Sequence, residues 1–268
     1  MYEEPYKWVE AVGNRRHYLD EQFKEGSPVV ALAYDAGILL LTVSKGTPKL
    51  YEIYDRLALG GMGHPADLEK LRFSLLEMAH VEGFNRSPSD VTGSRMVKYG
   101  IAPILKQAFE EVFKAPFIVK LLMAELGAKA GKNSLLTINY DGTFEETSHC
   151  AVLAATQSVQ ETMLQFLRGQ VPEGSSLDRT VAGALLAWAV GDRAQRRRET
   201  GQQDKHEKET TGSEDPAELA GYLRERVSDK TIECALLDRH ERGSSKYRML
   251  TVDELGRMLP PDLKAALS

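Results

Sequence analysis

Two apolar runs near the N-terminus determine the expected fold. They cover residues 29–34 and 38–43, and the short turn between them contains Gly37, which is able to adopt positive φ. Neither run alternates apolar and polar residues, so both faces of each strand are expected to be covered. A tight hairpin buried on both faces, this early in the chain, predicts a sandwich of two sheets with helices outside.

The rest of the pattern places strands and helices in blocks. We predict helices at 6–25, from 65, from 87, at 157–169, 177–190, 216–227 and 252–259. Strands are predicted at 50–59, 117–123, 134–140, 144–153 with a break, 231–237 and 247–251. The glycine-rich residues 60–63 are expected to break the chain after the third strand, and Pro103 is expected to kink its helix or delay its start. Blocks of this kind disfavour a doubly wound nucleotide-binding fold and favour two antiparallel sheets covered by helix pairs.

Residues 191–216 differ from the rest of the chain. They contain almost no apolar residues and carry charges of both signs. We therefore predict a long mobile loop within a single domain that spans residues 1–268. Arginines at 193 and 196–198 resemble a nucleic-acid patch, but acidic residues follow at once, which favours a solvated loop.

Composition and charge exclude several classes of function. The chain has 268 residues and a formal net charge of −5, which argues against a nucleic-acid-binding protein. No apolar stretch approaches the ~20 residues that span a bilayer, and the N-terminus lacks a signal pattern. Cys150 and Cys234 lie in apolar runs and are expected to be buried, reduced thiols. We expect no metal, no cofactor and no membrane partner, and a cytoplasmic protein.

Five short segments carry a resemblance to a known family. They are 29–34 (VVALAY), 49–56 (KLYEIYDR), 90–93 (DVTG), 140–142 (YDG) and 236–238 (LLD). In this order they resemble the proteasome family, most closely the α-type subunits of bacterial (actinobacterial-type) core proteasomes. The resemblance implies a four-layer α-β-β-α sandwich of the N-terminal nucleophile hydrolase type, within the α/β (α+β) class.

The family contains catalytic and noncatalytic subunits, and the resemblance bears on which kind this is. Catalytic β-type subunits cut themselves after a Gly to expose a nucleophile whose free amine accepts the proton. Gly26-Ser27 falls at that junction, but Val43 stands where an orienting Asp is implied, and Pro28 follows the would-be nucleophile. We therefore predict a subunit without catalytic residues. The alternative is a self-processing threonine- or serine-type peptidase with Ser27 as nucleophile.

An α-type subunit implies a gating and docking role in the 20S core. It would form a seven-membered ring on a β-type ring, admit unfolded substrates, and dock an AAA+ ATPase or other activator. The resemblance places Lys49 in the docking pocket between neighbouring α subunits, with Gly26 and Gly63 beside it. A lysine ammonium is a compact charge that suits the C-terminal carboxylate of an activator. The alternative for Lys49 is an ordinary solvated lysine at a strand edge.

The first residues match the segment that closes the pore of an α ring. Within residues 1–6, Tyr2, Pro5 and Tyr6 are the expected turn and packing residues of this gate. A frayed terminus is the alternative. A binding protein that shares only the sandwich is a third possibility, because a fold does not fix a function.

Overall fold

The computed structural model describes residues 5–111, 113–129, 131–199 and 216–264, and within them the chain forms two antiparallel sheets. The first sheet has the order β10-β9-β2-β1-β8 and the second β3-β4-β5-β6-β7. The strands are β1 Val29–Tyr34, β2 Gly37–Ser44, β3 Leu50–Tyr54, β4 Leu57–Gly63, β5 Val119–Glu125, β6 Ser134–Ile138, β7 Phe144–Thr147, β8 Cys150–Leu153, β9 Thr231–Asp238 and β10 Tyr247–Met249.

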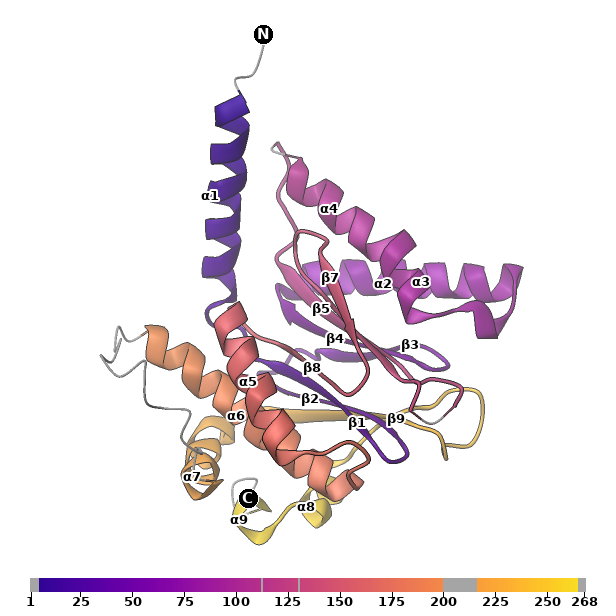
Figure 1. Ribbon diagram of the computed structural model, residues 1–268, viewed down its shortest axis with the longest axis vertical. Coiled ribbons are helices and arrows are strands. Elements are labelled where there is room, and N and C mark those ends of the chain that lie inside the picture. The colour runs from indigo at the N-terminus through magenta and orange to yellow at the C-terminus, as the bar shows by residue number, and fades with distance from the viewer. Residues whose placement is uncertain (1–4, 112, 130, 200–215, 265–268) are drawn as a thin grey trace.

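Helices cover the outer face of each sheet, which confirms the predicted four-layer α-β-β-α sandwich (Figure 1). The second sheet is covered by α2 Pro65–Asn85, the turn η1 Pro88–Asp90, α3 Gly93–Met96, the π-helical turn η2 Val97–Ile101 and α4 Ala102–Glu110. The first sheet is covered by α5 Gln157–Gln170, α6 Leu177–Glu199, α7 Pro216–Val227, α8 Val252–Met258 and α9 Pro261–Lys264. Helix α1, Pro5–Phe23, projects from one end of the sandwich.

The N-terminal hairpin is confirmed as the centre of the first sheet. Val29 pairs with Thr42 and Tyr34 with Gly37, so the short turn sets the register. All eight residues of β2 are buried, because one face packs on the helices and the other on the second sheet. The absence of alternation in the sequence is therefore a consequence of burial on both faces.

The segment predicted as one strand at 50–59 is two strands. Asp55 and Arg56 form a turn, and β3 and β4 pair across it. The prediction that residues 60–63 break the chain is wrong, because these residues form the last part of β4 and pair with β5. Small residues are needed there: a Cβ on Gly61 would lie 2.3 Å from Cδ1 of Leu68 in α2, and one on Gly60 would lie 2.9 Å from Cγ1 of Val29.

The helical stretch around Pro103 runs without a break from 93 to 110, but its hydrogen-bond pattern changes just before the proline. The π-helical turn η2 lies directly before α4, and Pro103 is the second residue of α4, where a missing N–H is tolerated. The expected helix start at Ser87 is only the three-residue η1, which Ser87 caps, and the longer helical stretch begins after Thr92.

The mobile loop predicted at 191–216 is wrong for its first part. Residues 191–199 continue α6, and residue 216 begins α7, while residues 200–215 lie outside the described part of the chain. Polar side chains of this stretch are paired inside the protein: Asp192 and Gln195 are only 4% and 6% exposed. The composition of this stretch predicted a solvated loop, whereas the structure has buried hydrogen bonds in residues 191–199.

Candidate functional site

Each of the three residues predicted for the docking pocket lies at or against the last residues of β4. The carbonyl oxygen of Lys49 accepts a hydrogen bond from the Gly61 N–H at 3.0 Å. A Cβ on Gly26 would lie 3.0 Å from Cε and Cγ of Met62. Gly63 is the last residue of the same strand. Residues far apart in sequence are thus brought to one short stretch, Gly61–Gly63.

Gly63 has a conformation that other residues rarely adopt. Its φ is +133°, and a Cβ there would lie 2.1 Å from the carbonyl oxygen of Ile118. The same carbonyl accepts a hydrogen bond from the His64 N–H at 2.7 Å. The glycine therefore lets the chain pass close to β5 before Pro65 starts α2.

Lys49 lies half-buried at the start of β3, beside a buried carboxylate. The Lys49 N–H donates to Oε2 of Glu233 at 2.8 Å, and Glu233 comes from the neighbouring strand β9. Burial lowers the pKa of the Lys49 ammonium, the charge of Glu233 opposes that change, and the charge of Lys230 adds to it. A half-buried ammonium meets less competition from water for a carboxylate than a fully exposed one does.

Ser27 and Val43 both have structural contacts in the described chain. Ser27 lies within the continuous chain between α1 and β1, and its Oγ accepts a hydrogen bond from Nε1 of Trp188 in α6 at 3.0 Å. Val43 is 1% exposed and packs in the core between the first sheet and α5 and α6. An apolar side chain in an apolar core neither holds a proton nor orients an amine.

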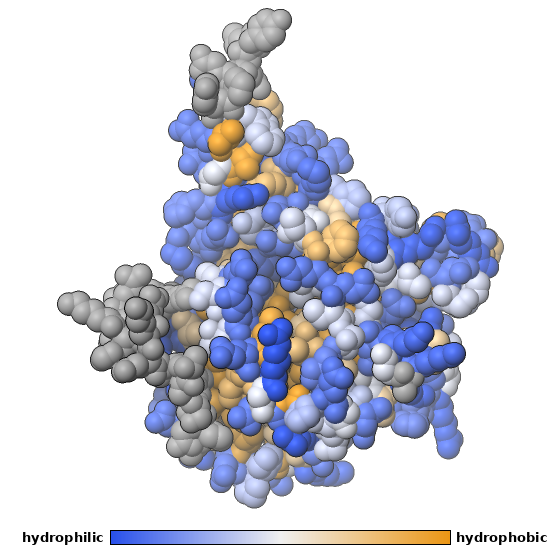
Figure 2. All heavy atoms as spheres, in the orientation of Figure 1, coloured by the Kyte–Doolittle hydropathy of each residue, from blue (hydrophilic) through white to orange (hydrophobic). Residues whose placement is uncertain are grey.

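The predicted gate residues lie at the boundary of the described chain. Tyr2 lies outside the described residues, while Pro5 and Tyr6 form the first turn of α1. The C-terminal half of α1 is anchored, because Leu19 and Phe23 are buried between the sheets and the Arg15 guanidinium donates to the carbonyl of Phe109 at 2.8 Å. Apolar atoms on the projecting part of α1 are visible in Figure 2, and Trp8 and Val9 are among the exposed residues there.

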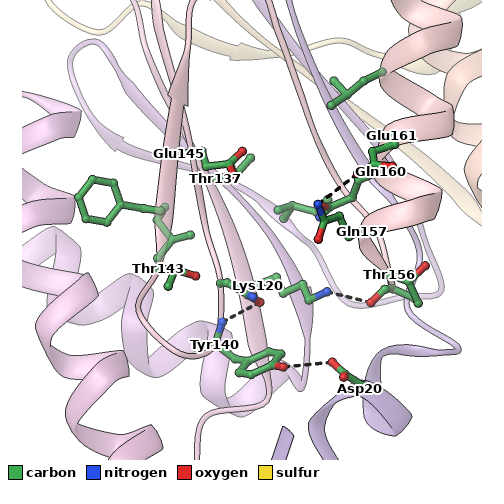
Figure 3. A pocket seen from close by; sticks show the side chains of 16 residues that line it. Asp20, Lys120, Thr137, Tyr140, Thr143, Glu145, Thr156, Gln157, Gln160 and Glu161 are labelled. Atoms are coloured by element: carbon green, nitrogen blue, oxygen red, sulfur yellow. Dashed lines mark hydrogen bonds between the residues drawn. The ribbon is translucent and has the colours of Figure 1, made fainter. Parts of the chain in front are cut away.

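A cavity of about 620 Å³ opens between the edge strands of the two sheets. Figure 3 shows Asp20 of α1 and Tyr140 of the β6–β7 turn pointing toward one another, and the Tyr140 hydroxyl donates to Oδ1 of Asp20 at 3.1 Å. Lys120 of β5 is 6% exposed and donates to the carbonyl oxygens of Ala154 and Ala155 at 3.0 and 2.8 Å. Burial lowers the pKa of Lys120 to about 8.

Gln195 links this cavity to the predicted pocket. Its Nε2 donates to the carbonyl oxygen of Gly26 at 2.7 Å, and its Oε1 accepts from the Ala155 N–H at 3.0 Å. The backbone at Gly26 is therefore fixed by a side chain from α6. Sequence reasoning missed both Gln195 and Lys120. Lys120 carried a usable signal, since it is a lysine inside an apolar strand, whereas Gln195 lay in a stretch that composition assigned to a loop.

Among the described residues, no group of three or more His, Cys, Asp or Glu side chains is placed to hold a metal ion. Within the same ranges, none of the helices is both long enough and apolar enough to span a bilayer. Cys150 and Cys234 are free and buried, in agreement with the expectation for these thiols.

Comparisons with known proteins relate the chain to proteasome subunits. The family model described as proteasome subunit matches residues 23–189. A protein named proteasome subunit alpha from Actinosynnema mirum is 27% identical over 254 residues, which cover 93% of this chain and 85% of the relative. Proteins of the same name from Saccharopolyspora erythraea and a Nocardioides species are 30% and 29% identical over 179 and 176 residues, covering 66% and 65% of this chain and 68% of each relative.

Proposed function

The chain belongs to the proteasome subunit family, and on that premise we propose that it is a noncatalytic α-type subunit of a 20S core. It assembles with copies of itself into a seven-membered ring, caps a ring of β-type subunits, and gates the entry of unfolded proteins. An AAA+ ATPase or another activator docks on the ring through its C-terminal tail. The proposed compartment is the cytoplasm.

The observation that carries the docking role is that Lys49, Gly26 and Gly63 all lie at or against the last residues of β4. The lysine offers the charge that a terminal carboxylate needs, and the two glycines let the backbone pack closely against Met62 and the Ile118 carbonyl, which fixes the chain beside the lysine. The positions of Ser27 and Val43 support the noncatalytic assignment. The exposed apolar residues of α1 support assembly with other subunits, since surfaces of this kind mark protein interfaces.

Substitution of Lys49 tests the docking role. We expect Lys49→Ala to leave the ring intact, because a half-exposed lysine contributes little to folding. It should weaken binding of a peptide copied from the last ten residues of an AAA+ ATPase of the same organism by about 2–5 kcal/mol. Fluorescence anisotropy measures the binding, and native mass spectrometry measures assembly.

The chain offers a matched control in Lys45. This exposed lysine precedes Lys49 by four residues, and its ammonium lies 3.6 Å from Asp229. Lys45→Ala should bind the peptide as wild type does. Equal affinity of Lys49→Ala and wild type would refute the pocket assignment. Deletion of residues 1–6 has a different expected effect, namely faster entry of peptide substrates without any activator.

A further inference from the structure

A buried carboxylate lies directly behind Lys49. Glu233 is on β9, where it pairs with Thr42 of β2, and it is 7% exposed. Its Oε2 accepts hydrogen bonds from the N–H groups of both Lys49 and Leu50, at 2.8 and 3.2 Å. A side chain 184 positions away in sequence thus holds two successive peptide groups of the predicted pocket.

These bonds fix the chain where it passes from one sheet to the other. β2 ends at Ser44 in the first sheet and β3 begins at Leu50 in the second, so residues 45–49 form the crossing. At Lys49 the N–H is held by Glu233 and the carbonyl oxygen by the N–H of Gly61. Hydrogen bonds to an ionised acceptor are stronger than neutral ones, so Glu233 is the stronger of the two restraints.

The second oxygen of Glu233 gives independent evidence that the carboxylate is there for its bonds to the turn. Among the described residues, Oε1 is buried and has no hydrogen-bond partner. Leaving a buried polar atom without a partner is unfavourable. If Glu233 only packed within β9, an apolar residue would serve better. Accepting hydrogen bonds from two N–H groups instead requires a polar side chain that is long enough to reach them.

We propose that Glu233 is the positioning residue of the docking pocket. It holds the backbone at Lys49 so that the lysine side chain meets the terminal carboxylate of a partner. The inference rests on the proposed function, because it assigns to Glu233 a role in the same pocket. Glu233 acts through Lys49 and Leu50, since its Oε2 is taken up by their N–H groups.

Two variants separate the reach of the side chain from its charge. Glu233→Gln keeps an oxygen at the same distance and removes the charge, whereas Glu233→Asp keeps the charge and shortens the side chain by one methylene. The probe is the ATPase-derived peptide used above, prepared once with a free carboxylate and once as the C-terminal amide. The ratio of the two affinities measures how strongly the carboxylate is recognised. The rates of hydrogen exchange at the Lys49 and Leu50 amides show whether these N–H groups are still held by hydrogen bonds.

Positioning predicts opposite behaviour of the two variants. Glu233→Gln should keep the acid-to-amide affinity ratio within about threefold of wild type, and Glu233→Asp should lower it about tenfold and speed exchange of the two amides. Glu52→Gln, which changes an exposed residue of β3, should match wild type. If the acid-to-amide affinity ratio falls in Glu233→Gln but not in Glu233→Asp, the effect comes from charge and the proposal is overturned. If the ratio is unchanged in both variants, the proposal is also overturned.

The proposed function and the inference fail in different ways. If Lys49→Ala keeps the carboxylate preference, the pocket assignment itself is wrong. A second outcome is that Lys49→Ala loses the preference for the free carboxylate, while Glu233→Asp keeps it although its Lys49 and Leu50 amides exchange fast. The pocket assignment is then correct and the positioning role of Glu233 is wrong. Native mass spectrometry of each variant, assembled with its β-type partner, verifies that the ring is present in every measurement.

Discussion

One buried carboxylate, that of Asp192, joins two helices of the layer that covers the first sheet. Asp192 of α6 is 4% exposed, and its Oδ2 accepts hydrogen bonds from the Tyr222 hydroxyl at 2.5 Å and from Nε of Arg226 at 2.9 Å. Arg196 adds a third contact at 3.3 Å. Tyr222 and Arg226 belong to α7, so Asp192 joins α6 and α7.

We expect Asp192→Asn to lower the free energy of unfolding at pH 7 by roughly 3 kcal/mol, because it leaves the partners of a buried charge without their counter-charge. Burial raises the pKa of Asp192, but the bonds from Tyr222 and Arg226 outweigh it and the net pKa lies below its ordinary value. A lowered folded-state pKa gives stability that is present above the unfolded pKa of about 3.9 and is lost as pH falls through the folded value.

The variant should therefore differ from wild type at neutral pH and approach it below about pH 4. Urea unfolding of both proteins from pH 7 down to pH 3 measures this difference. Asp253→Asn, a change at an exposed residue in the first turn of α8, is the control. A stability difference that stays constant over the whole range would contradict the assignment of the effect to the ionised carboxylate.

Residues of this kind are the part of the site that sequence did not predict. Lys49, Gly26 and Gly63 could be named because the segments around them resemble a family. Glu233, Gln195 and Asp192 could not, since each has a partner at least 30 positions away in sequence. Gln195 and Asp192 also stand in a polar stretch, where a polar residue indicates solvent until its partner is known.

At the scale of elements, the strand β4 is decided by packing rather than by propensity. Residues 60–63 carry three glycines, a pattern that normally indicates a break. They form a strand because β5 pairs with the segment along its length and α2 packs directly on it. The N-terminal hairpin, by contrast, was predictable because apolar runs and a short turn determine its pairing without help from distant residues.

Gly61→Ala tests whether the close approach of α2 requires the glycine. The added Cβ would lie 2.3 Å from Cδ1 of the buried Leu68, so the Leu68 side chain or α2 itself must shift, and we expect a loss of about 1–3 kcal/mol in the free energy of unfolding. Urea unfolding measures the loss. The matched control is Gly221→Ala in α7, where a Cβ would meet nothing within 4 Å and should stabilise the helix by about 0.5–1 kcal/mol.

If Gly61→Ala is as stable as wild type, the layer spacing between α2 and β4 is looser than the structure indicates. The comparison with Gly221→Ala is informative because both changes have the same effect on the unfolded chain. If the two variants change the free energy of unfolding in opposite directions, the difference must arise in the folded state.

At the scale of the whole molecule, the sandwich and the catalytic state are separate questions. Strand and helix blocks predicted the layers, because each sheet must bury both faces. The resemblance of the sequence implies that the same layers occur in catalytic and noncatalytic subunits, so that catalysis would depend on a few residues at the start of β1 and the end of β2. Here Ser27 is bonded to Trp188 of α6, and Val43 faces the helical layer rather than an open site.

We therefore expect that the chain does not cleave itself. The chain should be co-expressed with its β-type partner, the assembled core purified, and the intact mass of each subunit measured. The expected result is a chain that keeps residue 1 or 2 at its N-terminus, because Val43 cannot supply the carboxylate that orients an activated nucleophile. Ser27→Ala serves as the control, since removing the hydroxyl should leave processing and assembly unchanged. A mass that corresponds to loss of residues 1–26, with Ser27 first and with this loss abolished in Ser27→Ala, would establish the self-processing peptidase and refute the noncatalytic assignment.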